Sequence, residues 1–190
     1  MTRDRIFEAA KTILALEGLS GLSIRKIAKD SGLSPMAVYR HFADKEAIIN
    51  ALMEDGIIAW EARVRAIETD DPMAWLDDLM DAFMAFALDE PHRFDAAFFL
   101  AASKARQYPD DFAAGRSAAI AMVIARIERA QADGRLGGTP ALDIALALAA
   151  MGQGMVSMHR AQRFSSEAQF KSLFRASLRH CLASYSKGSK

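Results

Sequence analysis

Hydrophobic positions along this chain recur at helical spacing, and strand-like alternation of apolar and polar residues is almost missing. A first apolar stripe runs from Ile6 to Ile13, and Gly18 should end the helix that carries it. Ser23 and Ser34 each precede a short apolar segment, and serine is favoured at helix N-termini because its hydroxyl accepts a free backbone N–H. The pattern predicts an all-α chain.

The rest of the chain carries similar signals for helix starts. Further helices should begin near Asp44, Asp71, Glu90, Pro109, Thr139 and Ser166. We expect about nine helices in total, one of them a long helix that opens at Pro109 and closes at Gly134. A change in charge near residue 53 falls inside a helical pattern, so a continuous helix should link the two parts of the chain.

Residues 22–52 predict a helix-turn-helix. Two short helices flank Gly32-Leu33-Ser34, a three-residue turn that contains glycine. A miniature core can form from Leu22, Ile27, Ala28, Leu33, Val38 and Phe42 against Phe7 and Ile13. The positions that then face outward are Arg25, Lys26, Lys29, Met36, Tyr39, Arg40, His41 and Lys45.

Charge sharpens this picture. The 190 residues contain 24 basic and 24 acidic side chains, and 52% of the residues are hydrophobic. This composition excludes a disordered chain and a protein that coats DNA by bulk positive charge. The single cysteine excludes an internal disulfide framework or a Cys-rich metal site. The charges are nevertheless segregated along the chain. Residues 54–95 hold 3 basic and 12 acidic groups, whereas residues 96–190 hold 13 basic and 6 acidic groups. Residues 23–45 hold five basic and two acidic groups, which gives this segment a net positive charge.

A small cationic face on a neutral chain suits DNA binding. Cations neutralise phosphates, while a short helix can place its N-terminal residues at base edges in the major groove. Lys45 begins the next helix, where its ammonium and the helix dipole act on the same anion. We expect DNA contacts from Ser23, Arg25, Lys26, Ser34, Pro35, Met36, Tyr39, Arg40, His41 and Lys45. Alternatively, Lys26 and Lys29 simply solvate a helix face, and Tyr39 or His41 taken alone is a half-buried core residue.

The stretch from Ile6 through Leu52 resembles the N-terminal domain of TetR-family transcriptional regulators. The resemblance covers about a quarter of the chain and rests on Ile6, Ala9, Ala10, Gly18, Leu22 to Ala28, Gly32-Leu33-Ser34, Tyr39, His41-Phe42 and Lys45. It implies that Tyr39, His41 and Lys45 contact phosphates, and that Arg25 and the residues Ser34 to Met36 contact bases or phosphates. It further implies a DNA-binding domain over residues 1–47 and a helical domain for effector binding and dimerisation over residues 48–190.

The effector and dimer predictions combine the resemblance with side-chain chemistry. Methionine and aromatic side chains line adaptable apolar pockets but also fill ordinary cores. We expect an apolar effector among Trp60, Met80, Phe83, Met84, Phe98 and Met122, with Gln153, His159 or Arg126 as polar anchors. We expect a homodimer interface on two late helices, at Ala149, Gly152, Val156, Phe170, Phe174, Leu178 and Cys181, although these stripes also suit an intrachain core.

Other functions find less support in the sequence. No phosphate-binding glycine loop or catalytic motif is present, and the histidines have no metal-site spacing, so we expect no enzyme and no cofactor. We also expect a cytoplasmic protein without a membrane span, since Arg116 and Asp143 interrupt the most apolar runs. The leading hypothesis is a repressor released from a palindromic operator by a small effector. The alternatives are a regulator without an effector, and a small-molecule-binding protein that has lost DNA affinity.

Overall fold

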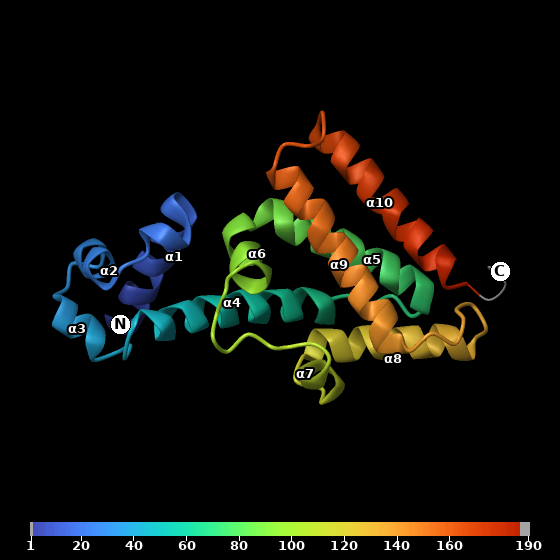
Figure 1. The fold of residues 1–190 in the computed structure, drawn as a ribbon, viewed down its shortest axis with the longest axis horizontal. Helices are drawn as coiled ribbons and strands as arrows, with labels where there is room; N and C mark the ends of the chain where they lie inside the picture. The colour runs from blue at the N-terminus through green and yellow to red at the C-terminus, as the bar shows by residue number, and fades with distance from the viewer. Residues whose placement is uncertain (1, 187–190) are drawn as a thin grey trace. The chain divides into compact units, whose positions relative to one another are not determined.

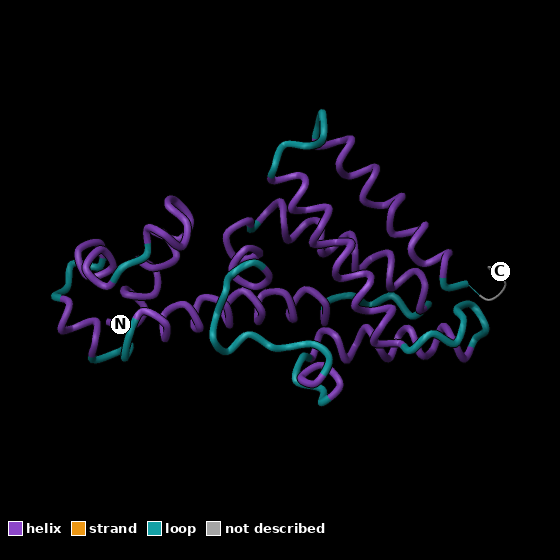
Figure 2. Tube along the Cα trace, in the orientation of Figure 1, coloured by secondary structure: helices purple, strands orange, loops and turns teal. Residues whose placement is uncertain are grey.

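The chain folds into helices joined by loops, as the computed structural model shows for residues 2–186 (Figures 1 and 2). Within those residues there are ten helices: α1 Thr2–Gly21, α2 Ile24–Asp30, α3 Pro35–Tyr39, α4 Lys45–Arg65, α5 Pro72–Asp89, α6 Pro91–Phe98, α7 Asp110–Ala113, α8 Ala118–Ala132, α9 Ala141–Arg160 and α10 Glu167–Ser184. No strand occurs in the same residues beyond one isolated bridge between Leu136 and Ser186. The all-α prediction is confirmed.

Side-chain caps explain where many of these helices begin. The side chains of Ser23, Ser34, Asp44, Asp71 and Ser166 each accept a hydrogen bond from the backbone N–H three residues ahead. Each bond satisfies one of the backbone donors that a first helical turn leaves without a partner. The start signals read from the sequence are therefore confirmed at these five positions.

Glycines interrupt the helical backbone at two positions that bear on the predicted helices. The single long helix expected between Pro109 and Gly134 is wrong, because Gly115 adopts a φ of +72° and separates α7 from α8. Ser117 then caps α8 as a new start. At Gly18, with a φ of +67° and a ψ of −167°, the backbone is not helical, so the first helical stripe stops there as expected, and α1 continues beyond this kink to Gly21. By contrast, α4 runs unbroken through residue 53, as expected.

The chain divides into two compact units. The first comprises the chain up to Ala59 together with Glu90–Ala105, and the second comprises Trp60–Asp89 and the chain from Arg106 onward. Segment 90–105, with α6, therefore belongs with the helix-turn-helix although it lies far along the sequence. The domain boundary after residue 47 stays a prediction.

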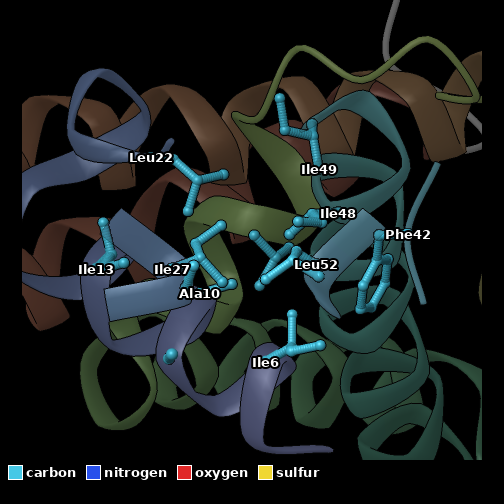
Figure 3. Close-up of a cluster of buried hydrophobic side chains, with 12 residues drawn as sticks. Ile6, Ala10, Ile13, Leu22, Ile27, Phe42, Ile48, Ile49 and Leu52 are labelled. Atoms are coloured by element: carbon cyan, nitrogen blue, oxygen red, sulfur yellow. The ribbon is translucent and has the colours of Figure 1, made fainter. Parts of the chain in front are cut away.

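The core of the first unit is built from α1 to α4. Figure 3 shows nine of its members labelled: Ile6, Ala10, Ile13, Leu22, Ile27, Phe42, Ile48, Ile49 and Leu52. Leu33 and Phe7 are partly buried and pack against this cluster. The core predicted for the helix-turn-helix is thus confirmed. Ile48, Ile49 and Leu52 of α4 also belong to this core, which the sequence pattern did not predict.

The second unit is a helical bundle around α5. This helix packs against α8, α9 and α10, while α9 also contacts α8 and α10. Its largest fully buried side chains are Trp75, Phe86, Phe170 and Phe174. Burial of such aromatic side chains supplies much of the hydrophobic stabilisation of a bundle.

The helix α9 differs from expectation in one respect. It has 20 residues and a window with a mean hydropathy of 1.5, so its length and composition alone would allow it to cross a membrane. Asp143 was expected to interrupt this apolar run enough to exclude a membrane span, and that expectation is corrected. One such helix is weak evidence for a span, since the core helix of a soluble protein meets the same criterion, and α9 buries Ile144, Leu148 and Val156 in its own chain.

Candidate nucleic-acid interface

A tight turn fixes α2 and α3 relative to each other. α2 ends at Asp30, and Gly32 follows with a φ of +66°, a conformation that favours glycine. The Ser34 hydroxyl then starts α3 by accepting a hydrogen bond from the Ala37 N–H at 3.2 Å. Pro35 occupies the first turn, where a helix needs no N–H from it. The helix-turn-helix predicted from the sequence is confirmed.

The residues predicted to contact DNA lie on the surface of this motif. Nine of the ten are exposed, and Lys26 is partly buried. The side chains of Met36 and Tyr39 are 67% and 49% exposed, so α3 presents an apolar group and a phenol to solvent. Tyr39 is thus half exposed and is not among the side chains that form the core of the first unit.

One predicted cation already has a partner within the chain. The Lys26 ammonium pairs with the carboxylate of Glu17 on α1, and both side chains keep roughly a third or more of their exposure. A phosphate would have to compete with Glu17 for this ammonium. Lys26 is therefore the weakest of the predicted cationic contacts, which agrees with the alternative that it solvates a helix face.

Arg3 is a cation near the motif that sequence reasoning missed. Its guanidinium lies 5.1 Å from the ring centroid of Phe42, the residue between His41 and the start of α4. Cations interact favourably with aromatic faces at this distance. Arg3 precedes Ile6 by three residues, so helical spacing placed it on the core-facing side of α1. Its partner was not predictable, because Phe42 belongs to another element.

An ion pair and a close backbone approach join α4 to α6. The Arg93 guanidinium donates to both carboxylate oxygens of Asp55, at 2.8 and 3.1 Å, and to Glu90 at 2.9 Å. The hydrogen bond from Arg93 lowers the pKa of Asp55 below its ordinary value. Next to this pair, a Cβ added at Gly56 would lie 2.5 Å from the Arg93 carbonyl oxygen and 2.8 Å from the Ala97 nitrogen. Glycine thus lets the two backbones touch.

The loop after α6 is also tied to α4. The Asn50 amide donates to the Ser103 hydroxyl at 3.1 Å and accepts the Lys104 N–H at 3.0 Å. The Glu46 carboxylate accepts the Ser103 N–H at 2.8 Å. These bonds lie in the first two turns of α4, the helix that begins at Lys45. Movement of α6 or its loop would therefore reach the start of α4 directly.

The residues predicted to line an effector pocket do not all lie in one unit. The second unit holds Trp60, Met80, Phe83, Met84, Met122, Gln153 and His159. Of these, Trp60 packs its ring 5.3 Å from Phe83, edge to face, and both are buried. Phe98 belongs to the first unit instead, where its ring lies 4.8 Å from that of Phe94. Phe98 therefore belongs to a different unit from the other residues predicted to line the pocket.

Two of the predicted polar anchors make contacts within their own unit. His159 stacks on Phe170, with ring centroids 4.3 Å apart. The Arg126 guanidinium lies 5.3 Å from the ring centroid of Trp75 and donates to the Asp70 carbonyl at 3.4 Å. An effector would have to share or displace these contacts.

Most residues predicted for the dimer interface are buried inside a single chain. Gly152, Val156, Phe170, Phe174 and Leu178 all belong to the core of the second unit, whereas Ala149 and Cys181 are partly exposed. A Cβ at Gly152 would lie 3.1 Å from both Met80 and Phe83, so the absence of a side chain at this position lets α5 pack closely against α9. The buried five therefore face their own bundle, and the large apolar residues that α9 and α10 expose are Leu146, Met158 and Leu173.

Part of the charge segregation has a structural explanation. Arg175 on α10 pairs with Asp81 on α5 at 2.7 Å, and Arg135 pairs with Asp71. These contacts join the acidic middle of the sequence to its basic last third. Ion pairs between helices therefore account for part of the segregation.

Metal binding finds no site in the described part of the chain. No three His, Cys, Asp or Glu side chains within residues 2–186 lie close enough together to hold an ion. Asp110 and Asp111 open the short helix α7, where Asp111 pairs with Arg116 at 2.7 Å.

Known proteins match both parts of the chain. The family described as bacterial regulatory proteins, tetR family, matches residues 6–52, and the tetracyclin repressor-like C-terminal domain matches residues 76–181. The HTH-type transcriptional regulator UidR of Escherichia coli strain K12 is 40% identical over 52 residues, which cover 27% of this chain. That match spans 26% of UidR, about a quarter of its length.

Solved structures agree over nearly the whole chain. A protein of unknown function from Rhodococcus sp. RHA1 has a TM-score of 0.78 at 24% identity, covering 98% of this chain and 96% of its own. The TetR-family transcriptional regulator PfmR from Thermus thermophilus has a TM-score of 0.66 at 21% identity, covering 95% and 98%. At these identities the likeness shows the fold. Since the C-terminal domain match alone spans more than half of the residues, the chain belongs to the TetR family of helix-turn-helix transcriptional regulators.

Proposed function

We propose that this chain binds operator DNA through the exposed face of α3 and the start of α4. The observation that carries the proposal is the exposure of Met36 and Tyr39 on a capped short helix, in a motif that also exposes Arg25, Arg40 and Lys45. In this proposal Ser34, Pro35 and Met36 contact base edges in the major groove, where apolar groups meet thymine methyls. Arg25, Tyr39, Arg40, His41 and Lys45 contact bases at the motif's edge or phosphates, and Ser23 and Lys26 make weaker contacts.

We propose a homodimer as the DNA-binding species. A single short recognition helix gives limited affinity, and a two-fold dimer engages two half-sites at high effective concentration. The exposed residues Leu146 and Met158 on α9 and Leu173 on α10 supply apolar surface for a second copy. A Cβ at Gly154 would meet no atom within 4 Å, so α9 has open space there for a second copy. The operator should then be a palindrome.

We propose that an apolar effector releases the protein from its operator, which makes it a repressor. The buried aromatic and methionine side chains of the second unit supply the chemistry for such a ligand. Binding would shift the population of DNA-competent conformers. Within the first unit, a shift of α6 would act on α4, because Arg93 and the loop after α6 are bonded to α4.

A regulator without an effector is the second candidate. Trp60, Phe83 and Met80 are almost fully buried and packed on one another or on α9. Side chains that fill a core leave no reason to expect a ligand at the same place. This candidate predicts that operator affinity does not respond to any compound. In either case we propose a cytoplasmic protein whose role is regulation rather than catalysis, with DNA and a second copy of the chain as its partners.

Selection from a pool of random-sequence DNA duplexes tests the proposal. The purified protein should enrich an inverted repeat, because two copies of α3 would read two half-sites. A variant with Tyr39→Ala and Lys45→Ala should enrich nothing above background while keeping its helical circular dichroism. If the wild-type protein is folded and enriches no sequence, the proposed function is wrong. If the variant enriches the same repeat, the assignment of contacts to this face is wrong.

A further inference from the structure

The turn between α2 and α3 is held by backbone bonds and by one side chain from outside the motif. The Leu33 N–H donates to the Ala28 carbonyl at 2.8 Å, and the Gly32 N–H donates to the Lys29 carbonyl at 3.0 Å. This pair of bonds closes the C-terminus of a helix in the pattern known as a Schellman motif. The carbonyl of Ser31, the C-cap residue, takes no part in either bond.

Arg5 donates to that carbonyl. Its guanidinium lies 2.6 Å from the Ser31 oxygen, although the two residues are 26 positions apart. The same guanidinium covers Gly32, since a Cβ added there would lie 3.1 Å from it. A cation at a helix C-terminus is also favoured by the helix dipole. Ile6 and Ala9 anchor the surrounding turns of α1 in the core, so Arg5 is attached to a fixed element.

The surroundings of Arg5 argue against direct contact with DNA. It lines a surface groove together with Lys29, and the acidic residues Asp4, Glu8 and Asp30 line the same groove. Lys11 neutralises Glu8, so the remaining charges of this groove balance and leave no net positive charge to attract a phosphate backbone. The guanidinium is therefore placed to act on the turn and not on a phosphate.

We propose that Arg5 is a positioning residue, which clamps the turn at Ser31 and thereby sets the orientation of α3 for sequence-specific reading. The inference rests on the proposed function. The clamp joins α1 to the segment that leads into α3, and a recognition helix that is loose by a small angle loses base contacts before it loses phosphate contacts. Loss of the clamp should thus lower operator affinity more than affinity for random DNA.

Three variants of the full chain test this proposal. Arg5→Gln removes the charge and shortens the donor, Arg5→Lys keeps the charge and one donor, and Lys11→Gln is the matched control. Lys11 lies on the same helix and pairs with Glu8, so its loss removes one positive charge without touching the turn. Fluorescence anisotropy would measure affinity for the selected repeat and for a random-sequence duplex across a salt series. Hydrogen exchange would report the Gly32 and Leu33 amides.

Arg5→Gln should weaken operator binding about tenfold, the effect of losing about one charge-assisted hydrogen bond. Random-duplex affinity should match that of Lys11→Gln, the salt slope should stay unchanged, and Arg5→Lys should recover most of the loss. The Gly32 and Leu33 amides should exchange faster in Arg5→Gln. Unchanged operator affinity in Arg5→Gln overturns the clamp, and a salt slope lowered by about one unit per protomer makes Arg5 a phosphate contact instead. If the wild type binds no DNA, the proposed function fails, whatever the exchange shows.

Discussion

The contact between α4 and α6 at Gly56 yields a prediction whose size follows from the structure. A Cβ placed there by Gly56→Ala would lie 2.5 Å from the Arg93 carbonyl oxygen, about 0.9 Å closer than the 3.4 Å at which ordinary contact begins. It would also lie 2.8 Å from the Ala97 nitrogen. Both atoms belong to the backbone of α6, so no side chain can rotate away. The whole helix α6 must shift.

Two opposing effects set the magnitude of the change in stability. Overpacking against backbone atoms that cannot move aside costs about 2–3 kcal/mol, the upper part of the usual range, whereas replacing glycine by alanine inside a helix gains about 1 kcal/mol. We expect a net loss of about 1–2 kcal/mol in the free energy of unfolding. For a chain of this length, that loss corresponds to a fall in Tm of about 3–6 °C. The displaced α6 would also strain the bond between Arg93 and Asp55.

Differential scanning calorimetry measures this effect. Glu54→Ala is the control, since Glu54 is exposed on the same helix and two residues away. The control should leave Tm unchanged within about 1 °C, because exposed substitutions usually change stability little. A Gly56→Ala protein as stable as the wild type, or more stable, would refute the close packing of α4 against α6.

The remaining predictions concern the DNA-binding face formed by α3 and the start of α4, the ion pair between α4 and α6, and the surface of α9. Tyr39→Ala should weaken operator binding about tenfold in an anisotropy titration, whereas the control Tyr108→Ala, a similarly exposed tyrosine of the second unit, should not. Because Arg93 lowers the pKa of Asp55 in the folded state, the carboxylate stabilises the fold above its unfolded pKa of about 4, and that contribution is lost as pH falls through the folded value. Asp55→Asn should therefore lower Tm at pH 7 and flatten the acid limb of Tm against pH, and an unchanged acid limb would contradict the ion pair. Leu146→Glu should yield a monomer in light scattering at micromolar concentration, and a persisting dimer would exclude that surface from the interface.

The sequence predicted local structure well because its signals are local. Ser23 and Ser34 cap their helices as expected, since a cap depends only on the next three residues. Gly115 was missed as a helix break, because a glycine inside an apolar run is compatible with a helix as well as with a turn. The outward face of the motif was also predictable, as the exposure of Tyr39 shows.

Interactions between distant elements could not be predicted. The pairing of Lys26 with Glu17 and of Arg5 with Ser31 depends on how α1 packs, which no spacing within the motif encodes. The residues predicted for the dimer interface also show that the sequence does not specify which element an apolar stripe packs against. Phe170 lies on an apolar stripe that would look identical facing a second copy or its own bundle, and the structure buries it in its own bundle.

The salt dependence of operator binding by the wild type and by Lys45→Ala tests the central proposal most directly. Lys45 is exposed at the start of α4, and we propose that each protomer uses it to neutralise one phosphate. Plotting log affinity against log salt concentration should give a negative slope that decreases in magnitude by about one unit per protomer in Lys45→Ala. Affinity should fall at low salt as well. If the slope and the affinity of Lys45→Ala equal those of the wild type, the face formed by α3 and the start of α4 does not bind DNA as proposed.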